Sequence, residues 1–141
     1  RCDPGRGEQA VIALDTNVLI RFLVEDDEQQ SRLATRLIEG AIERDEPLFI
    51  SDIVMCETVW VLSSAYRFSR AEIVQALSGL LRARAVVFTS SDRLARALDA
   101  YAKGKGDFAD YLIREHARAA GADTVATFDR SLLKERGFTK P

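Results

Sequence analysis

The sequence predicts a single α/β domain in which helices cover both faces of a short, mostly parallel sheet. Its 141 residues, 47% of them hydrophobic, suffice for one compact core and are too few for two ordinary domains. Short apolar runs alternate with segments whose apolar residues recur at helical spacing, an order typical of parallel sheets. We expect residues 11–141 to form this one domain. The polar, Gly- and Pro-containing residues 1–10 are expected to be an arm outside it, disordered or not native.

Four short apolar runs are the predicted strands. The first, residues 11–14, stops abruptly at Asp15, and its uninterrupted apolar character is typical of a strand buried on both faces. The other three are residues 48–50, 85–89 and 124–128. Ligands of parallel sheets bind in the crevice beyond the carboxyl ends of the strands, so a site is expected among the residues that follow these runs.

Capping residues mark where the predicted helices begin. Ser51 precedes an apolar helix, and Ser69 with Glu72 has the spacing of a capping box. Asp107 can cap the last long helix, which Gly121 ends. The predicted helices cover residues 17–24, 29–44, 52–66, 70–82, 92–102, 108–120 and 131–135.

The composition excludes several classes of protein. The formal net charge of −2 argues against a surface that binds nucleic acid by phosphate neutralisation alone. Any reaction on nucleic acid would therefore need a local feature such as a metal ion. No apolar stretch approaches the roughly 20 residues that span a bilayer, and we expect no membrane association. Cys2 and Cys56 are expected to stay unpaired in a reducing cytoplasm. Glycine-rich phosphate loops are absent, which argues against nucleotide enzymes. The single His116 is expected on the surface, which argues against a Ser-His-Asp hydrolase.

Three acidic residues fall where a parallel sheet would place a ligand. Asp15 follows the first predicted strand and Asp129 the last, so both are expected at one edge of the sheet, although each could merely cap the following helix. Glu57 lies in the second turn of a helix that is apolar nearly all round, and such a helix is expected to be buried. A carboxylate there is costly unless it is paired or binds a metal, which leaves an internal ion pair as the alternative.

A fourth element adds Asp107 and Asp110, which are three residues apart at a predicted helix start and project to nearly the same side. Capping and the helix dipole account for acids in this position, and for Asp107 we favour that account. Asp110 is the better ligand because it already lies on the helix. Carboxylates gathered at one edge repel one another, and a hard divalent cation such as Mg²⁺ or Mn²⁺ relieves this repulsion. The cation can also activate water and neutralise charge on a phosphoryl group.

Four segments resemble, in order and in spacing, the motifs of PIN domains. The opening motif resembles residues 13–20 (ALDTNVLI), and the second, in which Glu lies on a buried helix, resembles residues 51–57 (SDIVMCE). The third resembles residues 107–113 (DFADYLI), and the last resembles residues 127–129 (TFD). The resemblance covers residues 11–137, and the length of the chain is similar to that of the VapC toxins of prokaryotic toxin–antitoxin pairs.

This resemblance implies a three-layer α/β/α sandwich and a metal-dependent endoribonuclease, with Mg²⁺ or Mn²⁺ as cofactor and RNA as substrate. It also implies a cognate antitoxin as partner and a homodimer. It assigns the catalytic, metal-binding carboxylates to Asp15, Glu57, Asp110 and Asp129. It further suggests that Thr16, Asn17 and Thr127 orient these acids or their waters. Asp107 is an additional acid beside the third motif, which leaves open whether it or Asp110 binds the ion directly.

Basic and aromatic residues near these motifs have two interpretations each. The basic residues form either a solvated face or a rim that draws the RNA backbone toward the metal. They are Lys103, Lys105, Arg114 and Arg118. Phe108 and Tyr111 are expected in the core rather than as platforms for base stacking. Trp60, Val61 and Leu62 are also expected in the core, although their helix could instead present an apolar dimer surface.

Two rival functions stand against the toxin ribonuclease. In the first, the chain is an interaction protein whose acidic pocket receives the basic tail of a partner, and catalysis is weak or lost. In the second, it is a phosphoacceptor domain of the receiver or haloacid-dehalogenase type. The second is disfavoured because Asp15 is followed by Thr16 and Asn17, where a haloacid dehalogenase needs a second Asp two residues after the first.

Overall fold

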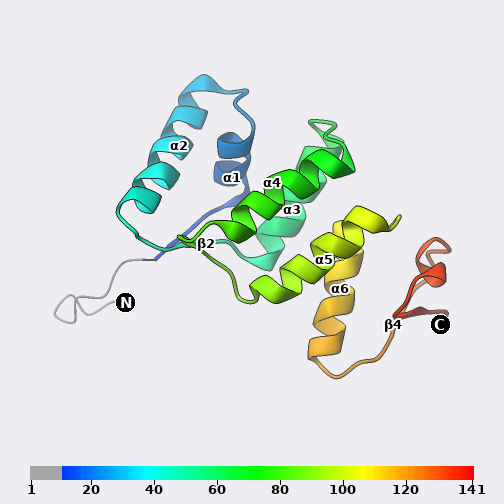
Figure 1. Ribbon diagram of the computed structural model, residues 1–141. Helices are drawn as coiled ribbons and strands as arrows, with labels where there is room; N and C mark the ends of the chain where they lie inside the picture. The colour runs from blue at the N-terminus through cyan, green and yellow to red at the C-terminus, as the bar shows by residue number, and fades with distance from the viewer. Residues whose placement is uncertain (1–10) are drawn as a thin grey trace.

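Short strands are separated by pairs of helices over most of the chain, in the order that the sequence predicts for β1 to β4 (Figure 1). The computed structural model describes residues 11–141, and the predicted arm at residues 1–10, with Cys2, lies outside the described residues. The elements are β1 (Ile12–Ala13), α1 (Thr16–Leu23), α2 (Glu28–Glu43), β2 (Leu48–Phe49), α3 (Asp52–Ser64), α4 (Arg70–Arg82), β3 (Val86–Val87), α5 (Ser91–Lys103), α6 (Phe108–Ala119), β4 (Val125–Ala126), the 3₁₀ helix η2 (Leu132–Lys134) and β5 (Phe138–Thr139).

α3 and α4 begin at the capping residues that the sequence predicts, whereas α1 is capped by Asp15 and not by Thr16 or Asn17. The Ser51 hydroxyl accepts a hydrogen bond from the Val54 N–H at 3.1 Å. Ser69 and Glu72 form the predicted capping box, with the Ser69 N–H donating to Glu72 Oε1 at 2.7 Å and the Glu72 N–H donating to Ser69 Oγ at 3.1 Å. These bonds satisfy N–H groups that have no partner within the helix. Because capping is a local interaction, the observed helix ends differ from the predicted ones by only a residue or two.

The strands form two parallel sheets instead of one. β2 is the central strand of the first sheet and aligns Leu48 with Ile12 of β1 and with Val86 of β3. β4 pairs with β5, a strand that the sequence analysis did not predict. Asp15 and Asp129 therefore follow strands of different sheets, and the prediction that both lie at one edge of a single sheet was wrong.

Apolar side chains hold the C-terminal segment against α6, which explains this second sheet. Leu132 and Phe138 are buried, and the Phe138 ring meets the Tyr111 ring edge-on with 6.4 Å between their centroids. β4 contacts α6, and β5 contacts η2. The last segment thus takes its position from a helix rather than from β1, and Figure 1 shows it at the opposite end of the molecule from α2.

One hydrophobic core joins the strands and helices into the α/β/α architecture that the sequence predicts. α1 packs on α2, α3 packs on α1, α4 and α6, and α5 packs on α4 and α6. The prediction that Phe108 and Tyr111 belong to the core is confirmed, because both side chains are almost completely buried. Other core residues without exposed surface are Leu19, Leu48, Ile50, Met55, Leu62, Ile73, Leu77 and Leu94.

α3 is buried on one side only, so the prediction that it would be buried all round was wrong. Met55 and Leu62 face the core, whereas Ile53 and Trp60 are 73% and 70% exposed. Glu57 is exposed as well. A helix buries only the stripe that faces its neighbours, so its apolar composition alone does not tell which residues are covered. Although α3 is apolar, none of the helices within residues 11–141 has the length and hydropathy needed to cross a membrane.

Truncation of two neighbouring residues tests this orientation of α3. Leu62 is fully buried, so Leu62→Ala should lower the free energy of unfolding by about 2–5 kcal/mol. Ser63 is exposed, so Ser63→Ala should change it by less than about 0.5 kcal/mol. Urea denaturation followed by circular dichroism, at one protein concentration, measures both values. Equal losses in the two variants would contradict the orientation.

Candidate metal centre

The first candidate carboxylate stands where α1 begins. Asp15 follows β1 and occupies the N-cap position in extended backbone geometry, with φ −81° and ψ 159°. Its Oδ1 accepts a hydrogen bond from the Thr16 N–H at 2.8 Å. Asp15 therefore does cap the helix, and its side chain stays exposed at the positive end of the helix dipole. Capping and metal binding are compatible, because one carboxylate oxygen is engaged and the other has no partner among the described residues.

A hydrogen bond joins the first motif to the second. Thr16 is buried, and its hydroxyl donates to Glu57 Oε1 at 2.5 Å. Glu57 lies on α3, which packs against α1, so this bond directs the Glu57 carboxylate to the start of α1 beside Asp15. Within residues 11–141, Glu57 forms no ion pair with a Lys, Arg or His side chain. A hydroxyl, rather than the alternative of a basic residue, is thus the described partner of Glu57.

Two further carboxylates lie at the start of α6. Asp107 is the N-cap residue, and its N–H donates to Asp110 Oδ2 at 2.9 Å. Asp110 is partly buried, whereas Asp107 is exposed. The turn therefore holds the Asp110 carboxylate by a backbone hydrogen bond and leaves the Asp107 carboxylate in solvent.

The environment of Asp110 disfavours its negative charge. Burial is the largest cause that raises the pKa of the Asp110 carboxyl above its usual value, and the hydrogen bond from the Asp107 N–H opposes this rise. The negative charges of Asp107, Asp129 and Glu135 raise the pKa further. β4 contacts α6, so the third and fourth motifs lie on neighbouring elements.

Asp129 is held by its own turn. Its Oδ1 accepts hydrogen bonds from the Ser131 N–H at 2.9 Å and from the Ser131 hydroxyl at 2.7 Å. These bonds to the charged form lower the pKa of the Asp129 carboxyl. The Thr127 hydroxyl accepts from the Asp129 N–H at 3.1 Å. Thr127 therefore orients the backbone of Asp129, while Ser131, which the sequence analysis did not consider, orients the carboxylate.

Glu135 is an acid that the sequence analysis missed. The Tyr111 hydroxyl donates to Glu135 and lies 2.7 and 2.9 Å from its two carboxylate oxygens. The same hydroxyl accepts from the Gly106 N–H at 2.9 Å. Glu135 follows η2 and belongs to no motif. Only the packing of the C-terminal segment on α6 brings it to Asp110, so no sequence signal could have found it.

The carboxylates form two groups on neighbouring elements. The first group is Asp15 and Glu57, connected through Thr16. The second group is Asp107, Asp110, Asp129 and Glu135. α3 contacts α6, which brings the two groups to adjacent helices. In the described part of the chain, no three acidic, His or Cys side chains are close enough together to hold a metal ion.

The donor chemistry of both groups suits a hard divalent cation. Carboxylate and hydroxyl oxygens are the ligands that Mg²⁺ and Mn²⁺ prefer, and Mg²⁺ usually keeps several waters and binds one or two carboxylates directly. None of the four predicted carboxylates is neutralised by a basic side chain within residues 11–141.

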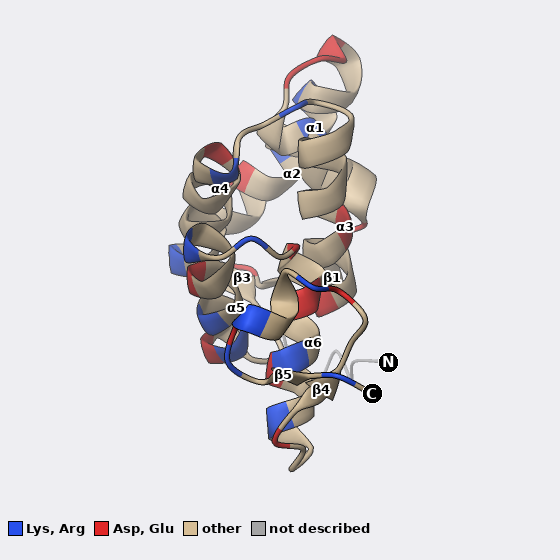
Figure 2. Cartoon of the chain, turned by 90° about the vertical axis from the view of Figure 1, so that its right-hand side faces the viewer, with Lys and Arg blue, Asp and Glu red and all other residues tan. Residues whose placement is uncertain are grey.

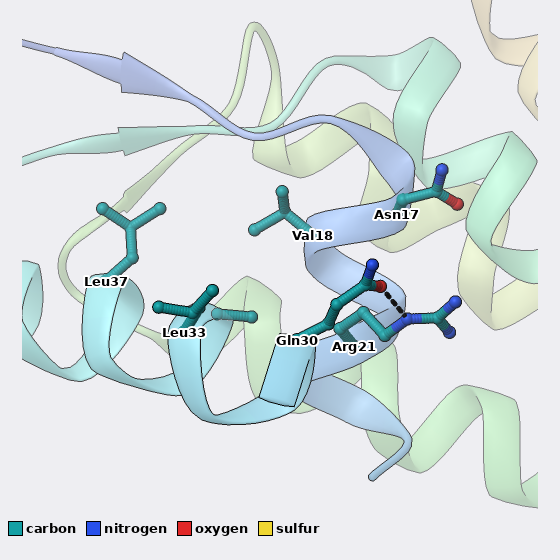
Figure 3. Close-up of a pocket in the computed structure, with 7 residues that line it drawn as sticks. Asn17, Val18, Arg21, Gln30, Leu33 and Leu37 are labelled. Carbon is teal, nitrogen blue, oxygen red and sulfur yellow. Dashed lines mark hydrogen bonds between the residues drawn. The ribbon is translucent and has the colours of Figure 1, made fainter. Parts of the chain in front are cut away.

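Asn17, the third predicted orienting residue, lines a groove between α1 and α2. Figure 3 shows its side chain near the start of α1, with Arg21 and Gln30 at the edge of the groove, joined by a 2.7 Å hydrogen bond. The groove has a volume of about 360 Å³. Its lining residues are Asn17, Val18, Arg21, Gln30, Leu33, Ala34 and Leu37. That Asn17 orients the acids stays a prediction.

The four basic residues of the predicted rim have two different environments. Lys103 and Lys105 border an open pocket beside η2. Arg114 donates to a backbone carbonyl of the C-terminal segment at 2.8 Å, and Arg118 forms an ion pair with the buried Glu115 at 3.0 Å. The lysines therefore face open space, whereas the arginines have internal partners.

Comparisons with known proteins identify the family of this chain. Residues 12–138 match the family model described as PIN domain. The chain is also 28% identical, over 125 residues, to a protein of Aquifex aeolicus (strain VF5) named VapC ribonuclease. That alignment covers 89% of this chain and 91% of the relative. The family match contains all four motifs and both groups of carboxylates.

The proximity of Asp129 to Asp110 predicts a change in titration. In metal-free protein, Asp129→Asn removes a negative charge that raises the pKa of Asp110, so this pKa should fall, while burial continues to hold it above its usual value. NMR titration of the carboxyl carbons measures the change. Glu43→Gln removes a charge at the end of α2, on the far side of the molecule, and should leave the Asp110 titration unaltered. If the pKa of Asp110 is the same in the wild type and in both variants, Asp129 is not its neighbour.

Proposed function

Because the chain belongs to the PIN-domain family, we propose that it is a metal-dependent endoribonuclease that cleaves RNA phosphodiester bonds and acts as the toxin of a toxin–antitoxin pair. The similarity to a VapC ribonuclease over 89% of the chain supports the substrate class. The observation that carries the proposal is the grouping of carboxylates that no described basic side chain neutralises. Such a toxin acts in the cytoplasm, where it meets its RNA substrate.

The proposed metal-binding and catalytic residues are Asp15, Glu57, Asp110 and Asp129. When bound, Mg²⁺ or Mn²⁺ activates water for attack on the phosphodiester and neutralises charge on the phosphoryl group. The protein's own residues hold the carboxylates in place. Thr16 fixes Glu57 through its hydroxyl, and Ser131 fixes Asp129 through its hydroxyl and N–H. No protein nucleophile takes part.

Of the two acids at the start of α6, Asp110 is the proposed ligand. It is partly buried and lies near the charges of Asp129 and Glu135, so a cation would relieve the repulsion there. Asp107 is exposed, and its N–H rather than its carboxylate contributes to the turn. Its charge adds to the negative potential of the site.

Substitution of one acid from each group tests the assignment. Asp15→Asn and Asp110→Asn should each reduce Mg²⁺- or Mn²⁺-dependent cleavage of RNA by at least about 100-fold, the upper end of the loss typical for residues that only orient a metal ligand. Cleavage of a fluorescently labelled RNA, with and without added metal, measures the rate.

Asp123→Asn is the matched control, because Asp123 is exposed in the loop between α6 and β4 and belongs to neither group. It should cleave at the wild-type rate. Activity that persists in Asp15→Asn and Asp110→Asn would come from a contaminant or another site. A wild-type chain that binds a basic peptide but never cleaves RNA would favour the interaction protein instead.

The groove between α1 and α2 suits a protein partner, which supports the proposed antitoxin. Leu33 is 57% exposed there, and Val18, Ala34 and Leu37 make the rest of the lining largely apolar. Concave apolar surfaces of this kind receive apolar side chains of a partner. Because Asn17 lines the same groove, a segment bound in it would end beside the first group of carboxylates.

The outer face of α3 supports the proposed homodimer. Ile53 and Trp60 are largely exposed on a helix with few polar residues, so this face is left uncovered in a single chain. Contact with the same face of a second copy would remove this apolar surface from water, and two-fold contacts of this kind are the commonest in homo-oligomers.

A charge on this face should separate the copies. Trp60→Glu is expected to shift the wild-type dimer to monomer in sedimentation velocity, because each interface would then hold two more negative charges beside those of Glu57 on the same face. Gln75→Glu places the same charge on the exposed side of α4 and should leave the dimer intact. A wild-type chain that sediments as a monomer at all concentrations would refute the dimer.

A further inference from the structure

A pocket lined by lysines opens beside the second group of carboxylates. It has a volume of about 460 Å³ and lies between the last turn of α5, the loop that precedes α6, and η2. Lys103, Lys105 and Lys134 line it together with Ser131 and Glu135. All three lysines are exposed. Figure 2 faces this side of the molecule and shows basic segments around α5 and β5.

The ammonium groups of this pocket are available to an anion. Lys105 and Lys134 form no ion pair within residues 11–141. Lys103 pairs with Asp99 at 3.1 Å, but the two side chains are 76% and 66% exposed. Surface pairs of this kind contribute little to stability, so Lys103 can exchange Asp99 for a bound anion.

The carboxylate in the pocket is already engaged. Both Glu135 oxygens lie within hydrogen-bond distance of the Tyr111 hydroxyl, and one of them also accepts from the Lys105 N–H at 3.4 Å. The loop that carries Lys105 packs directly on this pair. A Cβ at Gly104 would clash with the Tyr111 hydroxyl, so a residue without a side chain is required there. This close packing places Lys105 at a defined position at the edge of the pocket.

Ser131 connects the lysine pocket to the proposed metal centre. It lines the pocket, and its N–H and hydroxyl both bond to Asp129 Oδ1. Glu135, on the other side of the pocket, bonds to Tyr111, the residue that follows Asp110 in the chain. An extended polyanion with one phosphate at the carboxylates would therefore bring a neighbouring phosphate to the lysines.

We propose that this pocket binds a backbone phosphate of single-stranded RNA next to the phosphodiester that is cleaved. The inference rests on the proposed ribonuclease function and adds Lys134 to the RNA contacts. A chain with a net charge of −2 needs such a local site to hold an RNA backbone. Arg114, whose side chain is 11% exposed, and Arg118 do not take part, because both already have partners within the protein.

Binding measured without cleavage tests the pocket. The full chain in EDTA is titrated against a labelled single-stranded RNA oligonucleotide at several salt concentrations, and fluorescence anisotropy gives the affinity. Lys105→Ala and Lys134→Ala should each weaken binding about two- to fivefold, as expected for a solvent-exposed ion pair. Each should also reduce the slope of log affinity against log salt by about 0.7, the value for one phosphate contact on a single strand.

Arg36→Ala is the matched control, because it removes the same charge from the exposed side of α2. It should change neither the affinity nor the slope. A second series of oligonucleotides carries one uncharged methylphosphonate linkage at successive positions. One linkage next to the cleavage position should weaken binding to the wild type but cause no further loss in Lys134→Ala.

The outcomes separate this proposal from the proposed function. RNA that binds the wild type and the two lysine variants equally, with equal salt slopes, would overturn the phosphate pocket and leave the ribonuclease proposal standing. If Arg36→Ala loses as much RNA affinity as the lysine variants, the phosphate pocket would also be overturned. The loss would then depend on the total charge of the protein and not on the position of the lysines. A wild type that neither binds nor cleaves RNA would overturn both proposals.

Discussion

The cost of placing several carboxylates near one another is the constraint on which this site depends. Burial and three neighbouring negative charges act on Asp110, and each raises the pKa of its carboxyl. Hydrogen bonds from the protein's own groups offset this repulsion. Asp110 accepts from a backbone N–H, Glu57 accepts from a hydroxyl, and Asp129 accepts from both kinds of donor. These bonds orient the carboxylates without neutralising them, so the charge that the proposed cation would require is preserved.

The packing of the C-terminal segment on α6 completes the second group of carboxylates. Phe138 packs edge-on against Tyr111, and the Tyr111 hydroxyl binds Glu135. The same contacts bring η2, with Ser131 and Lys134, to the end of α5. One packing interaction therefore positions Glu135, the serine that orients Asp129, and the lysine of the proposed phosphate pocket. The second group of carboxylates and the lysine pocket lie next to each other because the same packing of the C-terminal segment on α6 positions both.

The two sides of α3 have different roles in the structure. Its inner side packs Met55 and Leu62 into the core, which fixes the helix, and its outer side carries Glu57 and Trp60. Since the core holds α3 in place, Glu57 need not be buried to have a defined position, and the Thr16 hydroxyl orients its carboxylate. The desolvation that the sequence suggested for Glu57 is therefore absent, and the acid is directed by a hydrogen bond instead.

The sequence by itself determined the order of the helices and of β1 to β4, and capping residues such as Ser51 and Ser69, because these depend on residues close together in the chain. It also supplied the four candidate acids, through motifs that resemble those of PIN domains. Only the tertiary structure decided which acids are neighbours, that β4 pairs with β5, and which side of α3 is covered. It also decided that Glu135 lies near Asp110 and that the lysines share a pocket. These features arise from contacts between distant segments, and such contacts depend on how whole faces pack, which no local spacing of residues specifies.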